Sequence, residues 1–196
     1  GHNTPEKPGD REILGNSLAS LQYGFTFAID YMGFDASVFF QGTGDHYWYP
    51  AGMNMSFWGP YAYSYASFIP RDFYTTMCWS EDNPDAYFPR PRAYSSTGGQ
   101  LRLINDRYLQ NIRYLRLKNL TLGYTIPKKV TKVLSLEKVR VYFSGENLHY
   151  WSPLTKVTNY LDPEASFQRN DTNSSARNQM YYPWQKTYMF GIDITF

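Results

Sequence analysis

The sequence predicts an all-β fold in which five long antiparallel strands form part of a large membrane-spanning barrel. Two observations lead to this prediction. Apolar and polar side chains alternate over stretches close to the ~9–11 residues that a tilted strand needs to cross a bilayer. The connections between these stretches are short, long, short and long, so the long loops all emerge on the same side of the sheet.

The first two strands are expected at 19–31 and 34–42. From Leu21 onward, the odd-numbered residues of the first strand are large and apolar, whereas the even-numbered residues are small or polar. This period of two is the signature of a strand with one apolar face. The two residues between the strands include Gly33, and such a short glycine-containing connection predicts a hairpin.

The third strand is expected at 113–125, where the phase of the alternation reverses near Lys118 and Asn119. One inserted residue exchanges the two faces of a strand, so the reversal predicts a β-bulge. A short connection with one or two helical turns is then expected at 126–137, followed by strands at 138–147 and 186–196.

Two long segments, 43–110 and 148–185, show no sustained period. Such lengths of irregular chain would argue against the strands in a compact soluble domain. In an outer-membrane barrel, long extracellular loops are expected, and the short turns at 32–33 and 126–137 then belong on the periplasmic side. Five strands cannot close a barrel, so both sheet edges are expected to pair with strands from the remainder of the barrel.

The composition excludes several classes of protein and site. The formal net charge of +2 is too small for a nucleic-acid partner. Three scattered histidines, at 2, 46 and 149, and the single cysteine, Cys78, lack the spacing of a metal site, and no cofactor is predicted. No apolar run approaches ~18 residues. The N-terminus has no signal-peptide pattern, so the chain is expected to be a mature protein or a fragment, and the open sheet favours a fragment.

Two groups of carboxylates raise the possibility of glycoside hydrolysis, which uses a pair of acids. One group contains Glu81, Asp82 and Asp85, and the other contains Asp162 and Glu164. Both lie beside prolines in polar segments, where solvated turns are far more common. We therefore predict no catalytic residue and no enzyme activity.

Three aromatic residues in the first long loop, Trp48, Trp58 and Tyr61, are candidates for contact with a ligand or a partner protein. Aromatic ring faces stack against sugars, and Trp and Tyr add a polar edge. The alternative is internal packing, because an ordered long loop must bury some of its side chains. The sequence alone leaves both interpretations open, with internal packing the more common outcome for any one ring.

Aromatic residues also flank the expected strand ends, as in the girdles that mark the two interfaces of membrane barrels. The outer group is Tyr150, Trp151, Tyr182, Trp184 and Tyr188, and the periplasmic group is Tyr31, Tyr124 and Phe196. Both groups are expected to lie at the level of the lipid headgroups, which makes outer-membrane lipid a predicted partner.

Five segments together resemble the C-terminal signature of SusC/RagA-type TonB-dependent transporters. They are GDREILGN at 9–16, GFDASVFFQG at 33–42, YLRLKNLTLGYTIP at 114–127, VRVYFSGENL at 139–148 and YMFGIDITF at 188–196. Their order and spacing match the family from about residue 9 to the end of the chain. The resemblance therefore covers nearly all of the sequence.

The resemblance implies a Bacteroidetes-type outer-membrane importer of glycans or other large nutrients, including peptides. Its barrel would have about 22 strands, and this chain would supply the C-terminal portion, including Phe196 as the barrel-assembly signal. A SusD-like surface lipoprotein and the TonB complex would be partners, the latter through an N-terminal part missing here. The alternative is a soluble β-sandwich that binds carbohydrate, which would cover the apolar face with a second sheet.

Overall fold

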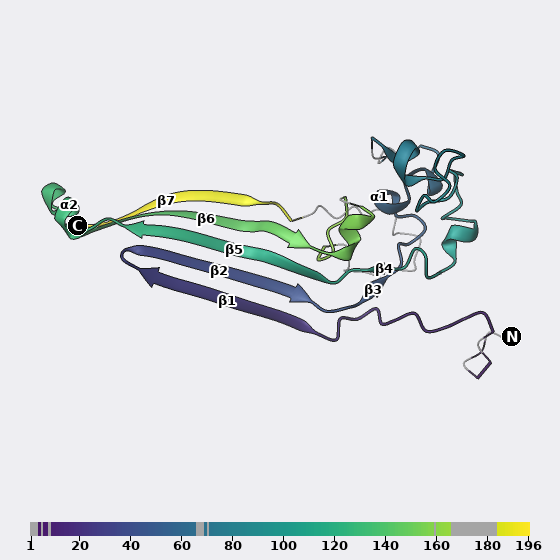
Figure 1. Ribbon diagram of the computed structural model, residues 1–196, viewed down its shortest axis with the longest axis horizontal. Coiled ribbons are helices and arrows are strands. Elements are labelled where there is room, and N and C mark those ends of the chain that lie inside the picture. Colours follow the sequence, from purple (N-terminus) through teal and green to yellow (C-terminus); the bar gives the residue numbers. More distant parts are fainter. Residues whose placement is uncertain are drawn as a thin grey trace. The chain divides into compact units, whose positions relative to one another are not determined.

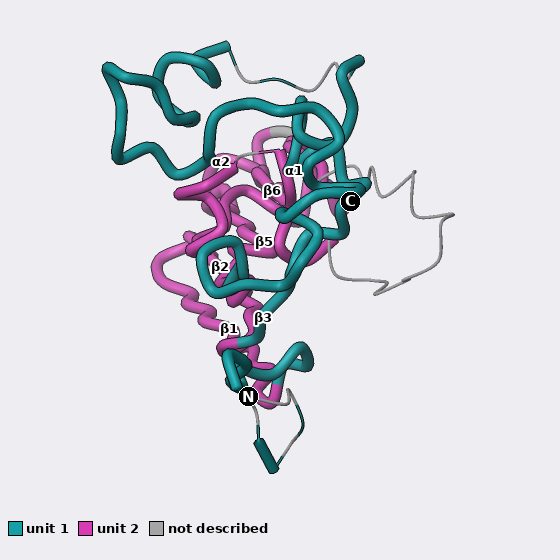
Figure 2. The backbone as a smooth tube through the Cα atoms, turned by 90° about the vertical axis from the view of Figure 1, so that its right-hand side faces the viewer, with its two compact units in different colours: residues 1–19, 46–111, 171–177 teal, residues 20–45, 112–170, 178–196 magenta. Residues whose placement is uncertain are grey.

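The computed structural model describes residues 4, 6–7, 9–65, 69, 71–158, 160–165 and 184–196, and these fall into two compact units (Figure 2). Of the described residues, those up to 19 and those at 46–111 belong to unit 1, whereas those at 20–45, 112–165 and 184–196 belong to unit 2. None of the helices in these described ranges is long and apolar enough to cross a membrane.

Unit 2 is built on one antiparallel sheet of five strands, as predicted (Figure 1). The strands, in their order across the sheet, are β1 (Gln22–Tyr31), β2 (Phe34–Thr43), β5 (Tyr114–Thr125), β6 (Lys138–Trp151) and β7 (Thr187–Thr195). Every neighbour pair is antiparallel. The strand ends that lead into the long connections therefore all lie at the same end of the sheet, here called the loop end. The opposite end of the sheet, where the short turns connect the strands, is called the turn end.

The first hairpin closes through Met32 and Gly33, which both have positive φ, at 49° and 85°. Two consecutive positive φ values define the turn whose twist matches the twist of paired strands. A Cβ atom at Gly33 would also lie 2.9 Å from the carbonyl oxygen of Thr125. Both the backbone angle and the close approach therefore require glycine here.

The predicted bulge in β5 is confirmed. Phe39 lies opposite Asn119 and Phe40 lies opposite Leu117, so Lys118 is the extra residue. Because one residue is inserted, the leucines on either side of Lys118 reach the same face of the sheet despite their opposite parity.

Strand β6 extends to Trp151, four residues beyond the end expected at 147. Its register with β5 jumps from Asn119–Glu146 to Leu117–His149, which leaves Asn147 and Leu148 opposite Lys118. Asn147 has a φ of 52°, a left-handed conformation that asparagine tolerates. The irregularity interrupts the alternation without ending the strand, which is why periodicity alone placed the boundary too early.

Short helical turns fill the connection at the turn end between β5 and β6. They are α2 (Lys128–Thr131) and η4 (Lys132–Leu134), and Pro127 precedes them with a φ of −55°. The one or two helical turns predicted for this connection are therefore present.

The two faces of the sheet differ sharply in composition. The apolar face carries residues 23, 25, 27, 29 and 31 of β1, 34, 36, 38 and 40 of β2, 115, 117, 120, 122 and 124 of β5, 139, 141 and 143 of β6, and 188, 190, 192 and 194 of β7. Many of these side chains are exposed, with Phe27 at 64% and Phe190 at 83%. The only other sheet in the described residues pairs β3 (Tyr47–Trp48) with β4 (Gln110–Asn111). It is too small to cover this face, which argues against a β-sandwich.

Unit 1 is more ordered than the irregular loop that the sequence suggested. Besides β3 and β4 it contains α1 (Met55–Trp58), η1 (Gly59–Tyr61), η2 (Phe73–Met77) and η3 (Gln100–Arg102). Its centre is an aromatic cluster formed by Trp48, Phe57, Trp58, Tyr61, Phe73, Phe88 and Tyr108, each no more than 5% exposed. Phe88 lies at the middle, with ring centroids 5.7 Å from Tyr61 and 5.9 Å from Tyr108.

Candidate functional site

The polar face of the sheet is the candidate functional surface, because it is where hydrogen-bonding and charged side chains gather. It carries residues 22, 24, 26, 28 and 30 of β1, 35, 37, 39, 41 and 43 of β2, 114, 116, 119, 121 and 123 of β5, 140, 142, 144, 146 and 150 of β6, and 187, 189, 191, 193 and 195 of β7. Successive side chains of a strand point to opposite faces, and the register carries this assignment across the sheet.

Near the turn end, Arg140 joins three strands on this face. Its guanidinium forms a two-point ion pair with Asp35, with N–O distances of 2.8 and 2.6 Å, and contacts Asp193 at 3.1 Å. The pair with Asp35 passes over Gly123, where a Cβ atom would lie within 2.4–2.6 Å of the two side chains. Glycine therefore provides the room for a bidentate charge pair across β5.

Two aromatic rings lie over glycines on the same face. A Cβ atom at Gly191 would lie 2.3 Å from the Tyr142 ring, and one at Gly24 would lie 3.2 Å from the Phe39 ring. Each ring thus covers a neighbouring strand where that strand has no side chain. Phe39, which interrupts the polar alternation of β2, is accommodated by this arrangement.

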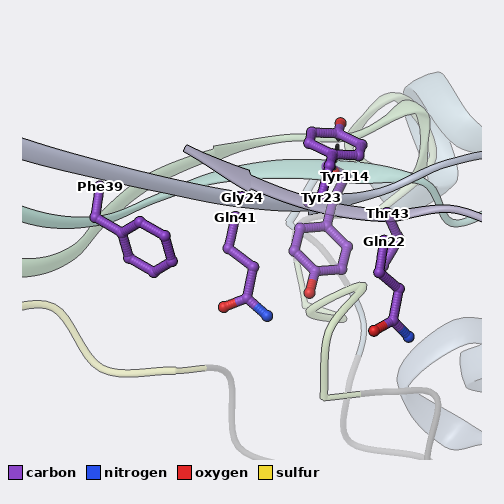
Figure 3. A pocket seen from close by; sticks show the side chains of 8 residues that line it. Gln22, Tyr23, Gly24, Phe39, Gln41, Thr43 and Tyr114 are labelled. Carbon is purple, nitrogen blue, oxygen red and sulfur yellow. Dashed lines mark hydrogen bonds between the residues drawn. The ribbon is translucent and has the colours of Figure 1, made fainter. Parts of the chain in front are cut away.

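A shallow hollow of about 430 Å³ lies beside β1 at the loop end. Figure 3 shows Gln22, Phe39 and Gln41 projecting to the same side of the sheet. Gly24 and Thr43 also line the hollow. Two side-chain amides beside an aromatic ring can donate hydrogen bonds, accept them and stack, which are the interactions that sugars and peptides offer.

The described residues of 152–165 form a second feature, here called the strap, which includes η5 (Pro153–Lys156). Leu154, Leu161 and Pro163 are buried, and the side chain of Asp162 is 1% exposed. The Asp162 carboxylate accepts hydrogen bonds from the main-chain N–H groups of Glu164 and Trp184, at 2.9 and 3.2 Å. The strap is therefore a folded segment anchored by a buried carboxylate.

Charged residues of β5 hold the strap. Arg116, also 1% exposed, forms an ion pair with Asp162, and its Nε lies 2.9 Å from Glu164. Lys118, the bulged residue, contacts both carboxylate oxygens of Glu164 at 2.7 and 2.9 Å. The Arg116 guanidinium lies 4.9 Å from the centroid of the Tyr150 ring, a cation–π contact.

This network corrects the expectation that Asp162 and Glu164 belong to a solvated turn. Buried charges are tolerated only when they are paired and hydrogen-bonded, and here both carboxylates are paired. Neither acid is available as a catalytic group in this arrangement. Sequence reasoning missed Arg116 and Lys118 as partners because they lie 46 residues from the acids along the chain.

The structure buries the three predicted contact residues of unit 1. Trp48 is 5% exposed, and Trp58 and Tyr61 are fully buried. The indole N–H of Trp58 donates to the carbonyl of Pro50 at 3.1 Å, and the Tyr61 hydroxyl donates to the carbonyl of Pro89. Burial raises the pKa of Tyr61 well above its ordinary value. Their placement favours internal packing over direct contact with a ligand.

The predicted girdle residues divide between the two faces. Tyr31, Tyr124, Trp151 and Tyr188 have the register of the apolar face. Tyr150 instead lies on the polar face against Arg116, which corrects its assignment to the girdle. Trp184 lies beside Lys118, 5.1 Å from its ammonium group.

The other two members of these groups are placed differently. Phe196 follows β7 and is exposed. Tyr182 lies outside the described residues. Among the described residues, no group of three or more His, Cys, Asp or Glu side chains could hold a metal ion.

Comparison with known proteins supports the resemblance drawn from the sequence. No protein-family model matches the chain. TonB-dependent receptors P26 and P3 of Formosa agariphila are 29% and 31% identical to it over 191 and 194 residues, or 95% of this chain. The chain spans only 18% and 17% of the length of these two relatives.

Solved structures with a similar fold include those of the RagAB peptide importer. The closed-closed state aligns with a TM-score of 0.63 and 22% identity over 94% of this chain, and the open-open state with 0.56 and 19% over 92%. The aligned regions are 18% and 17% of those chains. The fold is therefore that of a segment of an outer-membrane transporter barrel.

Proposed function

On the premise that this chain is a segment of a SusC/RagA-type TonB-dependent transporter of the outer membrane, we propose that it forms part of the wall of a nutrient-import passage. The apolar face contacts the acyl chains of the membrane. The polar face lines the interior, and the connections at the loop end lie outside the cell.

The observation that supports this proposal most strongly is the contrast between the faces of one sheet. Side chains such as Phe27, Ile192 and Phe190 are exposed on one side, at 64%, 64% and 83%. Arg140 and Asp35 form an ion pair on the other. Transmembrane barrels combine an outward apolar band with a polar interior in this way, whereas a soluble protein would bury such an apolar surface.

The proposed cargo is a glycan or another large nutrient such as a peptide. The hollow beside β1 supports this class, because Gln22, Gln41 and Phe39 supply amide hydrogen bonds and an aromatic surface. Peptides enter as candidates because the solved structures with this fold are described as a peptide importer. The hollow has no concentrated charge, which fits a neutral or mixed-charge cargo.

The proposed partners are a SusD-like surface lipoprotein, the TonB complex, and the remainder of the barrel. A lipoprotein would meet the loop-end surface, and the TonB complex would act through segments outside this chain. In this proposal, Trp48, Trp58 and Tyr61 hold unit 1 in shape for contacts made by its exposed residues. Direct ligand contact by these three rings would require unit 1 to open.

An uptake experiment tests the proposal. The gene encoding the whole protein is deleted and restored in its host, and uptake of fluorescent glycans and peptides is compared with and without a functional TonB complex. We expect deletion to abolish uptake of one class, and loss of the TonB complex to have the same effect. Uptake that continues after the deletion for every glycan and peptide tried would contradict the proposal.

Substitutions within the passage sharpen this test. Gln41→Leu removes an amide from the hollow and is expected to lower uptake without lowering the amount of protein in the outer membrane. Lys129→Gln, an exposed change in α2 at the turn end, is the matched control and should leave uptake unchanged. Equal uptake by the two variants would argue against cargo contact at this hollow.

A further inference from the structure

A second hollow, of about 810 Å³, opens at the loop end of unit 2. Its lining includes three basic residues, Arg113, Lys156 and Lys186, each of which is exposed. The strand residues of its lining come from both faces: Tyr23, Leu115, His149 and Trp151 have the register of the apolar face, and Thr43, Tyr114 and Tyr150 have that of the polar face. The hollow therefore lies at the loop ends of the strands, where a basic rim adjoins the margin of the apolar face.

The positive charge of this rim is only partly compensated. Arg113 forms an ion pair with Asp45 at 3.0 Å. Within the described part of the chain, no carboxylate lies at ion-pair distance from Lys156 or Lys186. The rim thus presents excess positive charge and several hydrogen-bond donors.

The aromatic side of the hollow is suited to the boundary between headgroups and acyl chains. The centroid of the Trp151 ring lies 4.6 Å from that of the His149 ring and 6.5 Å from that of the Phe40 ring. The Trp151 side chain remains 50% exposed. Trp and Tyr favour this level of a membrane because they combine an apolar body with a polar edge. A ligand bound here would have an anionic group at the rim and apolar chains along Phe40 and Leu115.

We propose that this hollow binds the phosphate group of a phosphorylated lipid in the outer leaflet, with the acyl chains against the apolar face. Lysine and arginine donate charge-assisted hydrogen bonds to phosphate oxygens, and basic residues at a membrane surface attract anionic headgroups. The proposal rests on the proposed function for the position of the loop end at the outer surface. It adds a lipid site at the loop end of the strands, next to the hollow beside β1, with which it shares Tyr23, Thr43 and Tyr114.

The test uses the whole purified protein in detergent and diphosphoryl lipid A as the probe, with bound lipid counted by native mass spectrometry. The double variant Lys156→Gln, Lys186→Gln is expected to bind this lipid with about thirtyfold lower affinity than the unchanged protein, from about 1 kcal/mol for each lysine. Lys128→Gln, Lys129→Gln, at the turn end, is the control of equal charge loss and should bind as the unchanged protein does.

Two further probes identify what the site recognises. Dephosphorylated lipid A should bind equally weakly to all three proteins, and inorganic phosphate should not displace lipid A. Equal retention of lipid A by the double variant and the unchanged protein would overturn the proposal. Displacement by inorganic phosphate would overturn it too, because the site would then take a soluble anion.

Failure of this inference can be told apart from failure of the proposed function. A heat-dependent shift in gel mobility reports whether each variant is a folded barrel, and fractionation of cells reports whether it resides in the outer membrane. Absence of the unchanged protein from that membrane would contradict the proposed function. If the protein resides in the outer membrane but the variant Lys156→Gln, Lys186→Gln binds lipid A as the unchanged protein does, only the proposed lipid site is contradicted.

Discussion

Unit 1 and the sheet of unit 2 are both rich in aromatic residues but use them in opposite ways. In unit 1, Trp58, Tyr61 and Phe88 are almost completely buried against one another. On the sheet, Phe27 and Phe190 are 64% and 83% exposed. Similar side chains therefore serve a self-contained core in one region and an outward surface in the other.

This difference identifies the surroundings that each region requires. A core buries its own apolar area and gains stability from it in water. An exposed apolar face of this size gains nothing in water and indicates contact with another phase or protein. The contrast teaches that aromatic content alone does not distinguish a loop core from a membrane face, whereas the period of the sequence does.

The largest expected effect on stability comes from a substitution in the core of unit 1. Trp58→Ala removes the largest fully buried side chain and should destabilise unit 1 by about 3–5 kcal/mol, as for other buried aromatic residues. Limited proteolysis on intact cells should then cut the 46–111 region faster. Phe27→Leu on the sheet is the comparison variant, and it should leave both the cutting rate and the amount of folded barrel unchanged.

A comparable effect is expected from the strap, which is the part of unit 2 that buries charge. Asp162→Ala removes one of the two carboxylates paired with the buried Arg116 and leaves only Glu164; breaking a buried pair costs at most about 3–5 kcal/mol. Hydrogen exchange should show faster amide exchange at 160–165. Ser152→Ala, which removes only the hydroxyl that accepts from the Leu154 N–H at 3.3 Å, should have a much smaller effect. Unchanged exchange in Asp162→Ala would show that the ion pair does not hold the strap.

A charge on the apolar face should have a slightly smaller effect. Phe27→Arg places a cation where we expect acyl chains, and such a substitution costs about 2–4 kcal/mol near the centre of the bilayer. The fraction of protein that shows the mobility of a folded barrel in gels should fall. Thr26→Arg places the same charge on the polar face and should be tolerated. Equal loss in both variants would remove the distinction between the faces.

The smallest effect concerns Cys78, which is buried in unit 1 at 2% exposed. Burial raises the pKa of its thiol, so less of the reactive thiolate is present at neutral pH than for an ordinary cysteine. Labelling by a maleimide should be slow in the native protein, and its rate should go on rising with pH beyond the range in which labelling of an ordinary thiol levels off. Trp58→Ala should speed the labelling. An identical labelling rate in native and unfolded protein would contradict the burial.

The sequence was sufficient to predict the sheet, because the alternation at β1 and β7 and the phase reversal at Lys118 are local signals. It could not place the end of β6, since the irregularity at Asn147 depends on the pairing with Lys118 of another strand. It also missed the pair of Asp35 and Arg140, which are 105 residues apart and meet only across Gly123. Local patterns set the strands and their faces, whereas contacts between distant residues depend on register.

The same reasoning explains why the predicted contact residues are buried. Trp48 and Trp58 carry the side chains that a ligand-binding loop would use, but burial depends on how residues 46–111 fold, and no period in that segment reveals it. The strap residues Asp162 and Glu164 looked like a solvated turn because their cations lie in β5. In both regions, residue type alone was a poor guide to exposure.

The most direct test of the central claim is a fluorescence measurement along β1 in the whole protein, reconstituted in lipid vesicles. With Cys78→Ser as the background, single cysteines replace Phe25, Thr26, Phe27, Ala28 and Ile29 in turn and carry a small fluorophore. Lipids with brominated acyl chains should quench the fluorophore at 25, 27 and 29 and leave it bright at 26 and 28. Equal quenching at all five positions, or none, would contradict the placement of the apolar face against lipid.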